Sequence, residues 1–487
     1  MSLNKKNVLL FFIFAAGLSL RLYRIGANDL WYDEAVSFAL SKNLDPFYIV
    51  YHDFHPPLYH LVLSCWINLF GVSEFILRLL SVVFSLAAIP IIYKIGRTIL
   101  NHSVGILAAL IFTLSPFQIW YAQEARSYAM SVFLVSLAVM FLAQILYEDK
   151  RYLWKYFIII SSLSILTEYI NLLVLFSFTP LFFLRRDLLK RWLISWMAIF
   201  LAFLYPLSIK AWGFIEGGFW IDRPTILSVI DTFKRFSLGY ESTLSVSALI
   251  LFGCFALFGA FKLLRQRSKL IFIVSPIFIT SITVFVISRY LPVSIYLDRQ
   301  LLPVSIFYYL LISAGISMVN TKAVKAFALV MIIIFNIFSL NEYYAKVLPK
   351  CKKPFKPLIE FINKHRNKDD ILVFGTKVMR ASIGCYYLRD MDSYFFIEER
   401  DYIMTHPVDY NFSKALTIIK SLEDMQSQDI KKVWLLTGCW ERDGRIDDSS
   451  RSAKRWVSRG GSFLKSKAFD GIFVDLFELN KRNSHEE

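Results

Sequence analysis

Cysteine is scarce in this sequence, and its few copies are scattered. The 487 residues include five cysteines, with no Cys-x-x-Cys pair and no cysteine and histidine at the spacing of zinc ligands. No structural zinc site of the common kinds is visible in this pattern. Cys351, Cys385 and Cys439 lie near the C-terminus. Two of these three could pair in an oxidising compartment, but the spacing does not say which two.

Acidic residues are few relative to basic ones. The chain has 54 Lys and Arg against 38 Asp and Glu, which gives a net charge of +16. The basic residues form short clusters between apolar runs rather than one face of a soluble domain. Nucleic acid is therefore not an expected partner, and the clusters instead indicate membrane topology.

Apolar residues, in contrast, are abundant. Hydrophobic residues make up 56% of the chain and aromatic residues 17%, and the mean hydropathy is +0.50. A soluble protein of this length is much less apolar. The composition predicts a mainly α-helical polytopic membrane protein, with the lipid bilayer as its first partner.

Candidate spans recur along the first 340 residues. Residues 156–184 leave two alternatives open, a hairpin through Thr167, Glu168 and Tyr169 or one long buried helix. A signal peptide over residues 1–22 is the rival of a first span, but no cleavage site of small residues follows it, so we expect a span. The apolar runs indicate about 11 transmembrane helices, near residues 8–22, 75–93, 103–119, 128–146, 156–167, 170–184, 192–209, 244–261, 270–288, 301–319 and 323–340.

Charge asymmetry predicts the orientation. If the N-terminus is cytoplasmic, the inner segments hold 17 of the 28 Lys and Arg before residue 341, but only three acids, Glu148, Asp149 and Asp187. The Lys and Arg bias therefore predicts a cytoplasmic N-terminus, and we expect a multi-pass protein of the plasma membrane. The other 13 acids before residue 341 then all fall on the outer side.

The composition changes near residue 341, where long apolar runs stop and charged residues become frequent. We expect a transmembrane domain over residues 1–340 and a soluble domain over residues 341–487. Beyond a proline- and lysine-rich connector, β-like runs alternate with helix-like stretches near 378–388 and 413–426. This alternation predicts a small α/β domain, which lies outside the cell if there are eleven spans. The β-like runs are residues 371–375, 432–438 and 472–479.

Two adjacent acids, Asp33 and Glu34, stand in the stretch LWYDEA after the first apolar run. Leu30, Trp31 and Tyr32 favour the membrane interface and would hold the acids near the lipid boundary. The alternative is that both acids simply face water in a loop. Charged groups at membrane depth are costly, so acids held at this boundary are candidates for function.

A second stretch, HPPLYH at residues 55–60, contains His55 and Tyr59. Pro56 and Pro57 can start a helix, which leaves His55 just before its N-terminus. An imidazole beside the free N–H groups of a helix start can bind an anion. A lone histidine with a purely structural role is the alternative.

Two further stretches fall on the same outer face. YAQEARSYAM at 121–130 and RYLPVSIYLDRQLLP at 289–303 each supply acids, tyrosines and guanidiniums. A structural contact within the first loop and anchoring to lipid headgroups by the second are the alternatives. The candidate substrate-binding residues here are Gln123, Glu124, Arg126, Tyr128, Tyr296 and Arg299.

Together these stretches combine two chemistries on one membrane face. Arginine forks suit phosphate, and carboxylates can take a proton from a hydroxyl. A reaction that needs both is glycosyl transfer from a lipid phosphate.

The order of these motifs resembles the membrane-embedded GT-C glycosyltransferases of glycosyltransferase family 39. This is the dolichyl-phosphate-mannose protein mannosyltransferase-like group, which also includes the bacterial lipid A aminoarabinose transferases. The likeness covers roughly residues 8–340, with LWYDEA, HPPLYH, QEARSYAM and YLDRQLLP in the right order. It departs from the aminoarabinose transferases, which have a lysine before PPL where this chain has His55. The later lumenal domain of the mannosyltransferases is also not evident.

The resemblance implies an inverting transfer of a sugar from a polyprenyl-phosphate donor to an acceptor hydroxyl on the external face. It implies that Asp33 is the general base and that Glu34 binds the acceptor or the donor sugar. It also places His55, Arg126 and Arg299 at the donor phosphate. The sugar and the acceptor, which could be a protein, a glycolipid or a surface polysaccharide, stay open.

Rival functions are a transporter or flippase of lipid-linked sugars, and a receptor-like module anchored by its membrane part. Transporters favour polar groups at mid-bilayer and internal repeats, whereas here the acids gather at one surface and no repeat is visible. No metal site is predicted and no cofactor is certain. A divalent metal ion held by the paired acids is a possibility that the sequence leaves open.

Overall fold

The structure, a computed structural model, divides into two compact units. One, the membrane unit, comprises Met1–Gly26 and Asp53–Lys350; the other, the tail unit, comprises Ala27–His52 and Cys351–Glu487. The sequence predicts a boundary at residue 340, whereas the structure groups the segment after the first helix with the C-terminal residues. The described residues are 5–42, 44–53, 55–216, 221–292, 294–347, 355–367, 369–375, 383, 386–387, 393–396, 416–419, 431–438, 448–469 and 471–479.

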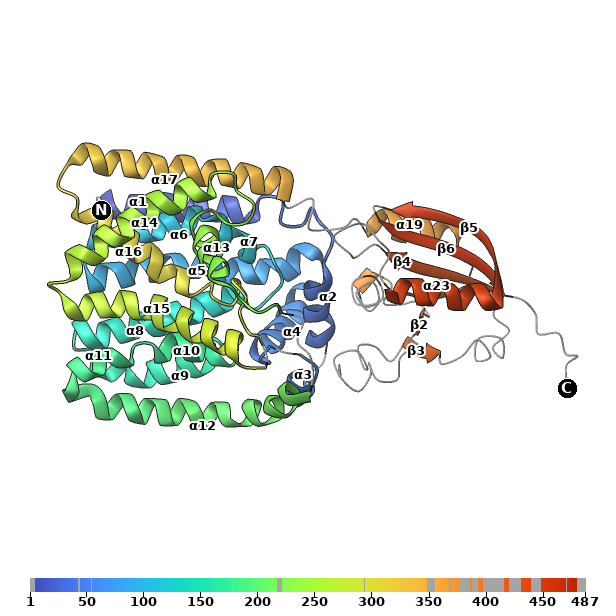
Figure 1. Ribbon diagram of the computed structural model, residues 1–487, viewed down its shortest axis with the longest axis horizontal. Helices are drawn as coiled ribbons and strands as arrows, with labels where there is room; N and C mark the ends of the chain where they lie inside the picture. The colour runs from blue at the N-terminus through green and yellow to red at the C-terminus, as the bar shows by residue number, and fades with distance from the viewer. Residues whose placement is uncertain are drawn as a thin grey trace, which may run out of the picture. The chain divides into compact units, whose positions relative to one another are not determined.

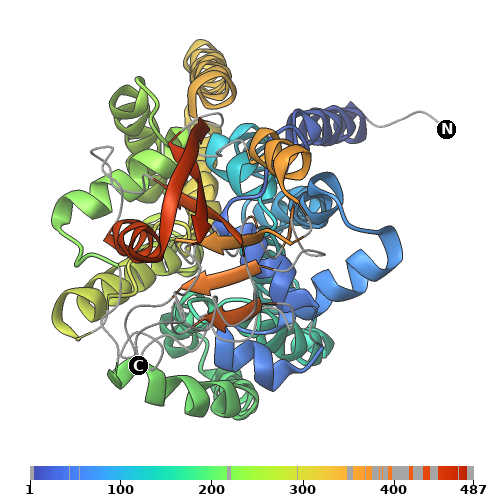
Figure 2. The same ribbon diagram turned by 90° about the vertical axis from the view of Figure 1, so that its right-hand side faces the viewer.

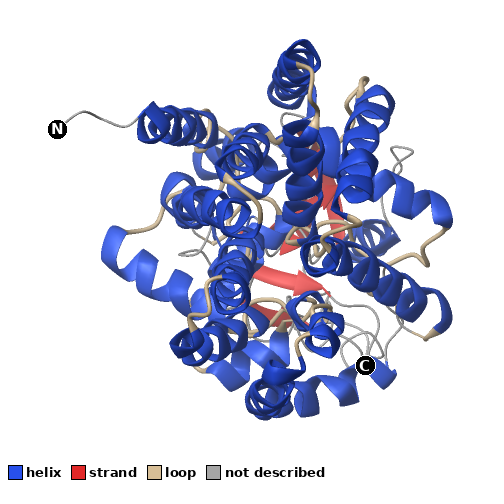
Figure 3. Ribbon diagram, turned by 90° about the vertical axis from the view of Figure 1, so that its left-hand side faces the viewer, coloured by secondary structure: helices blue, strands red, loops and turns tan. Residues whose placement is uncertain are grey.

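The membrane unit is helical, and most of its helices lie side by side (Figures 1 and 3). Each apolar run predicted as a span contains helix. The helices are α1 (Lys5–Leu22), α4 (Leu58–Phe70), α5 (Glu74–Ile99), α6 (His102–Leu114), α7 (Pro116–Ala122), α8 (Tyr128–Tyr147), η1 (Arg151–Leu153), α9 (Trp154–Ile165), α10 (Asn171–Phe176), α11 (Thr179–Leu184), α12 (Arg186–Glu216), α13 (Ile226–Leu238), α14 (Ser245–Leu263), α15 (Arg267–Tyr290), α16 (Val304–Met318), α17 (Lys322–Glu342) and η2 (Tyr343–Val347).

The predicted number of spans is not confirmed. Among the described residues, five helices are long and apolar enough to cross a membrane, or six if one bent pair counts as a single span. Four shorter apolar helices accompany them. The five are α5, α8, α14, α15 and the helical stretch Lys322–Lys346 that contains α17. The chain is thus a multi-pass membrane protein.

The bent pair is α6 and α7, which meet at an angle of 60°. The sequence predicts one run over residues 103–119, but Pro116 interrupts it. Proline has no N–H for the helix ladder and disfavours helical geometry in the residue before it. Ser115 ends α6 and also caps α7, because its hydroxyl accepts a hydrogen bond from the Gln118 N–H at 3.4 Å. The break directs α7 toward the loop that contains Gln123 and Arg126.

A second break resolves the two alternatives for residues 156–184. Helix α9 ends at Ile165 and α10 begins at Asn171, so Thr167, Glu168 and Tyr169 form a turn rather than the middle of one long helix. Asn171 closes this turn, since its side-chain N–H groups donate to the Ser164 carbonyl at 2.8 Å and to the Ser131 hydroxyl at 2.9 Å. Glu168 is thereby held at a fixed place in the unit.

Close helix contacts depend on small residues. A Cβ atom on Gly315 of α16 would lie 1.9 Å from the Phe255 carbonyl oxygen of α14, and one on Gly259 would lie 2.5 Å from the Leu311 carbonyl oxygen. Glycine at both positions lets the two backbones touch, which is how helices in lipid commonly associate. Helix α16 carries the loop with Tyr296 and Arg299 at its start.

The tail unit contains a six-stranded sheet of order β3-β2-β1-β4-β6-β5 (Figure 2). The first four strands in that order pair in parallel, and β6 pairs antiparallel to both β4 and β5. This confirms the predicted α/β class. The strands are β1 (Ile371–Phe374), β2 (Ser393–Phe396), β3 (Leu416–Ile419), β4 (Lys432–Gly438), β5 (Gly461–Phe469) and β6 (Ile472–Leu479).

A helix covers each face of this sheet. Alternate residues of β1 point to opposite sides, so Leu372 and Phe374 pack with α19 (Lys356–His365), whereas Ile371 and Val373 pack with α23 (Asp448–Gly460). The three predicted β-like runs are strands β1, β4 and β6. The helix predicted near 413–426 is wrong at residues 416–419, which form β3. Its β-branched residues Thr417, Ile418 and Ile419 favour a strand.

The remaining tail predictions lie largely outside the described residues. These are most of the helix predicted near 378–388, and Cys351, Cys385 and Cys439, so their pairing stays a prediction. Cys65 and Cys254, in the membrane unit, are free and exposed.

The segment Ala27–His52 is fastened to the C-terminal part of the tail unit. It forms α2 (Tyr32–Ser41) and α3 (Pro46–His52). The Asp29 carboxylate accepts hydrogen bonds from the Phe355 and Lys356 N–H groups, at 2.5 and 2.9 Å, and so caps the start of α19. The Leu30 N–H donates to the Tyr387 hydroxyl at 3.0 Å.

Candidate functional site

Asp33 and Glu34 stand in the first turn of α2, where negative charge is favourable. Glu34 is fully buried, and its carboxylate accepts a hydrogen bond from the Trp31 N–H at 3.3 Å. Asp33 is half-buried, and its backbone carbonyl accepts from the Ser37 hydroxyl at 3.0 Å. Both acids belong to the tail unit, whereas the basic candidates belong to the membrane unit. Their common site therefore stays a prediction.

In the membrane unit, the loop before α4 folds around the buried carboxylate of Asp53. The His60 Nε2 lies 2.9 Å from one Asp53 oxygen, and the His55 backbone N–H donates to the other at 3.3 Å. Pro56 and Pro57 turn the chain between the two histidines. Asp53 thus fixes the HPPLYH stretch from both ends.

The side chain of His55 pairs with Glu168, which comes from the turn between α9 and α10. The His55 Nδ1 lies 3.0 Å from Glu168 Oε1. The Ser127 hydroxyl donates to the same oxygen. Only 4% of the Glu168 side chain is exposed. Three segments that are distant in sequence therefore meet at this carboxylate.

Positive charge keeps both loop carboxylates ionised. Burial opposes ionisation of Asp53, but the hydrogen bond from His60 and the charges of His55, His60 and Arg126 hold the pKa of Asp53 far below its ordinary value. Burial likewise opposes ionisation of Glu168, and His55, Ser127 and Arg126 lower the pKa of that carboxyl. Arg126 therefore lies within electrostatic reach of both acids, and only 4% of it is exposed.

Tyr128 joins this cluster to Arg299. The His55 and Tyr128 rings meet edge to face with centroids 6.0 Å apart. The Arg299 guanidinium lies 5.8 Å from the Tyr128 ring centroid, within cation–π range. Arg126 lies two residues before Tyr128. The structure thus brings together His55, Arg126, Tyr128 and Arg299, which we name the basic cluster.

Two other candidates have structural partners. The Gln123 amide donates to the Arg21 and Tyr23 carbonyls at 3.0 and 2.8 Å, and its oxygen accepts from the Tyr343 hydroxyl at 3.0 Å. It thereby satisfies carbonyls at the C-terminal end of α1, which no helical N–H can reach. Glu124 accepts a hydrogen bond from the Trp120 indole at 2.7 Å.

The last two candidates are tyrosines. Tyr59 is 1% exposed, and its ring packs on His60 with centroids 5.9 Å apart. Tyr296 is bonded to α13, because its hydroxyl lies 2.9 Å from the Thr232 hydroxyl. Burial raises the pKa of Tyr296. Tyr59 therefore lies beside the Asp53–His60 pair, whereas the Tyr296 hydroxyl is engaged by another helix.

Sequence reasoning missed several members of the site. Asp53 and His60 flank the HPPL stretch as HDFHPPLYH, so their symmetry about the prolines was a readable signal. Glu168 was predicted to lie in a hairpin on the outer face but was not chosen as a candidate, although a charged residue between two apolar runs is one.

Among the residues that the structure describes, no group of three or more His, Cys, Asp or Glu side chains could hold a metal ion. A divalent ion at the acids of α2 stays a hypothesis from the sequence.

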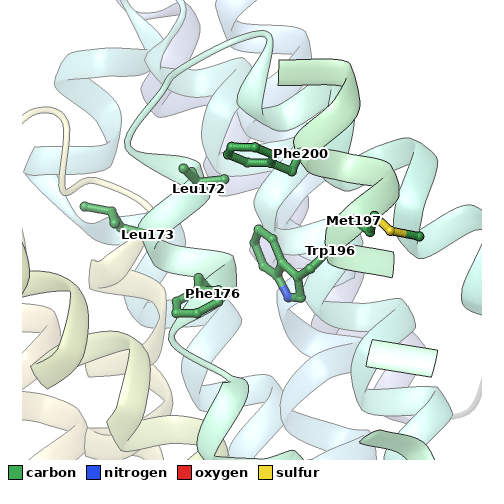
Figure 4. Close-up of a pocket in the computed structure, with 6 residues that line it drawn as sticks. All are labelled: Leu172, Leu173, Phe176, Trp196, Met197 and Phe200. Atoms are coloured by element: carbon green, nitrogen blue, oxygen red, sulfur yellow. The ribbon is translucent and has the colours of Figure 1, made fainter. Parts of the chain in front are cut away.

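An apolar pocket of about 460 Å³ lies between α10 and α12 (Figure 4). Its side chains converge from α10, which begins three residues after Glu168, and from α12. The lining is aliphatic and aromatic, so it suits hydrocarbon better than a sugar. The lining residues are Leu172, Leu173, Phe176, Trp196, Met197 and Phe200.

Residues 54–210 match the family described as dolichyl-phosphate-mannose-protein mannosyltransferase. This segment includes HPPLYH, QEARSYAM and Glu168, which are most of the site in the membrane unit. None of the curated proteins compared with the sequence matches it.

Solved structures resemble nearly the whole chain. ArnT from Cupriavidus metallidurans in the apo state superposes with a TM-score of 0.66 at 12% identity, over 97% of this chain and 98% of that one. The same protein bound to undecaprenyl phosphate gives a TM-score of 0.60 at 12% identity, over 96% and 97%. The oligosaccharyltransferase AglB from Archaeoglobus fulgidus, with an inhibitory peptide and a dolichol-phosphate, gives 0.53 at 12% identity, over 96% and 74%.

At such low identity the likeness to these structures is one of fold. It agrees with the family match over residues 54–210 and with the order of the sequence motifs. The chain therefore has the GT-C fold of membrane glycosyltransferases, with a small α/β domain at its C-terminal end.

Proposed function

We propose that this protein is a glycosyltransferase that moves a sugar from a polyprenyl-phosphate donor to an acceptor hydroxyl. Two of the similar structures contain undecaprenyl phosphate or dolichol-phosphate, which supports a donor of this class. The family match over residues 54–210 supports sugar transfer. The acceptor class stays open between protein, glycolipid and surface polysaccharide.

The observation that carries the proposal is the basic cluster. His55 and Arg299 come from distant stretches and contact the Tyr128 ring, and Arg126 lies two residues before Tyr128 in the chain. Guanidiniums bind phosphate oxygens through paired N–H groups. A polyprenyl phosphate leaves as a stable anion, so it needs electrostatic stabilisation rather than a proton from a general acid. Arg126 and Arg299 would supply that stabilisation, and the Glu168 partner would orient His55.

In an inverting displacement, the acceptor oxygen attacks opposite the leaving phosphate. One base on the acceptor side is sufficient, and no protein nucleophile is required. We assign the base to Asp33, and the positioning of acceptor or donor sugar to Glu34. The prediction that these acids share a compartment with the basic cluster follows from the Lys and Arg asymmetry.

This asymmetry also supports the proposed location. We place the protein in the plasma membrane with its N-terminus in the cytoplasm, and its donor-binding residues and tail domain outside. Binding of a divalent ion by Asp33 and Glu34 is a separate hypothesis. If such an ion takes part in the reaction, a chelator should lower the rate of sugar transfer.

The variant Asp33→Asn tests the mechanism. Removal of a general base commonly lowers turnover by about 10²–10⁴-fold, and insertion and folding should be unaffected. The measurement is transfer of label from a panel of radiolabelled polyprenyl-phosphate sugars in membranes, which also identifies the sugar.

Asp45→Asn is the matched control, because Asp45 caps α3 through the Phe47 N–H at 2.9 Å, which an asparagine oxygen can also accept. Near-normal turnover of Asp33→Asn would refute the assignment of Asp33 as the general base. Movement of labelled lipid across the bilayer without transfer would instead favour the flippase.

A further inference from the structure

A second polar network lies beside the basic cluster and has no part in the proposed chemistry. It centres on Asp298, which is 8% exposed and stands next to Arg299 in the chain. The Asp298 carboxylate lies 2.9 Å from the Arg235 guanidinium and accepts a hydrogen bond from the Tyr240 hydroxyl at 2.6 Å. We name these three residues the brace.

The brace ties a loop to two neighbouring elements. Arg235 belongs to the last turn of α13, and Tyr240 follows Gly239, whose φ of +76° ends that helix. Asp298 belongs to the loop before α16. Residues 298–303 have turn structure with local backbone hydrogen bonds, so side chains such as that of Asp298 supply the loop's polar contacts to other elements. A buried carboxylate with two partners is a strong local anchor, since losing either partner is costly.

Tyr240 is itself held in place by helix α7. Its ring lies 5.0 Å from Trp120 and 5.8 Å from Phe117, centroid to centroid. Its hydroxyl also pairs with the Tyr121 hydroxyl. Arg235 also contacts this ring, with its guanidinium 4.9 Å from the Tyr240 ring centroid.

The network reaches the basic cluster by two routes. Along the chain, Asp298 is bonded to Arg299, whose guanidinium lies over Tyr128 at 5.8 Å. Through space, Tyr121 packs on the same ring, with the Tyr121 and Tyr128 centroids 5.0 Å apart. The brace thus fixes both the backbone that carries Arg299 and the ring beneath its guanidinium.

We propose that Arg235, Asp298 and Tyr240 are positioning residues that hold Arg299 at the donor phosphate. The proposal rests on the proposed function, because it assigns Arg299 to that phosphate. A cationic group contributes fully only in the correct geometry, and a displacement of about 1 Å can cost about 10²-fold. In this proposal the brace acts through Arg299 rather than directly on the sugar or the acceptor.

Binding of undecaprenyl phosphate to the full-length protein in nanodiscs tests this proposal. We expect Asp298→Asn to raise the Kd about tenfold, and Tyr240→Phe, which keeps the ring, to raise it less. Arg235→Ala should also weaken binding, whereas Arg235→Lys, which keeps the charge, should restore part of it. Asp231→Asn is the control, since it breaks only the exposed pair with Lys234 on the same helix, at 2.9 Å.

A double-mutant cycle separates positioning from general destabilisation. In the Arg299→Ala background, Asp298→Asn should have no further effect on the Kd, because the group that it positions is gone. An equal loss of affinity in both backgrounds would overturn the proposed positioning role of the brace. Unchanged binding by Asp298→Asn and Tyr240→Phe would also overturn it. If the wild-type protein does not bind undecaprenyl phosphate, the proposed function itself fails and the brace with it.

Discussion

The charged cluster at the start of helix α8 is buried, whereas the charged cluster just past its end is exposed. At its start, Glu168, Asp53 and His60 have side chains that are 4%, 8% and 2% exposed. Past its end, Asp149 and Asp187, paired with Arg151, have side chains that are 71% and 47% exposed. The 20 residues of α8 separate the clusters by about 30 Å, which is the thickness of the hydrocarbon core.

This difference in exposure shows which charges lower the stability of the folded protein unless they have partners. Exposed ion pairs gain little because water and salt screen them, and they serve mainly to orient the chain in the membrane. Buried charges lose hydration and persist only with good partners. The cluster at the start of α8 has such partners from three segments, so its cost is consistent with a functional role.

The largest expected effect comes from breaking the buried cluster. Glu168→Ala leaves His55 and the Ser127 hydroxyl without their acceptor and Arg126 with one less counter-charge. Loss of one partner of a buried pair commonly costs about 3–5 kcal/mol. Denaturant unfolding of the detergent-purified protein should show this loss. A change within experimental error would mean that the pair is not buried as described.

The loss of folding stability at acidic pH should depend on Asp53. Its pKa is lowered in the folded protein, by His60, His55 and Arg126 against the effect of burial. The stability that it contributes is therefore present above the ordinary pKa near 4 and is lost as the pH falls below it. Asp53→Asn should lower the unfolding midpoint at pH 7 and flatten its decline between about pH 5 and 3.

This scan is best made in about 0.5 M salt, which screens the exposed pairs but not the buried ones. An unchanged acid slope in Asp53→Asn would show that other carboxylates cause the decline.

The smallest effect is expected at the exposed cluster. Asp187→Ala removes contacts to Arg185 at 3.2 Å and to Arg151 at 3.5 Å, but both partners stay hydrated. The unfolding midpoint should match that of the wild type, in contrast to Glu168→Ala. A comparable loss at both sites would remove the distinction between the two clusters.

The sequence was sufficient for the class of fold, because apolar runs and the change near residue 341 report burial directly. Strands β1, β4 and β6 were predictable for the same reason, as short β-rich runs between polar stretches. The count of spans was not, because Pro116 bends one run and the runs at 156–167 and 170–184 form helices of only 12, 6 and 6 residues. Runs of similar hydropathy become either long spans or short helices, depending on packing.

For the candidate site, the rarity of charged residues beside apolar runs pointed to His55, Arg126 and Arg299, whose roles stay predictions. Sequence reasoning could not find the partners of these residues. His55 and Glu168 are 113 positions apart, and Tyr121 and Tyr240 are 119 apart. The assignment of Gln123 to the substrate stays a prediction, and the structure adds that its amide donates to the Arg21 and Tyr23 carbonyls at the end of α1.

The most direct test of the account compares Arg126→Ala with Arg151→Ala, one arginine from each end of α8. Binding of undecaprenyl phosphate and transfer from its sugar-linked form should both fall for Arg126→Ala, with turnover reduced by about 10²–10³-fold. Both should stay at the wild-type level for Arg151→Ala. Equal donor binding by the two variants would contradict the claim that the basic cluster, at the start of α8, holds the donor phosphate.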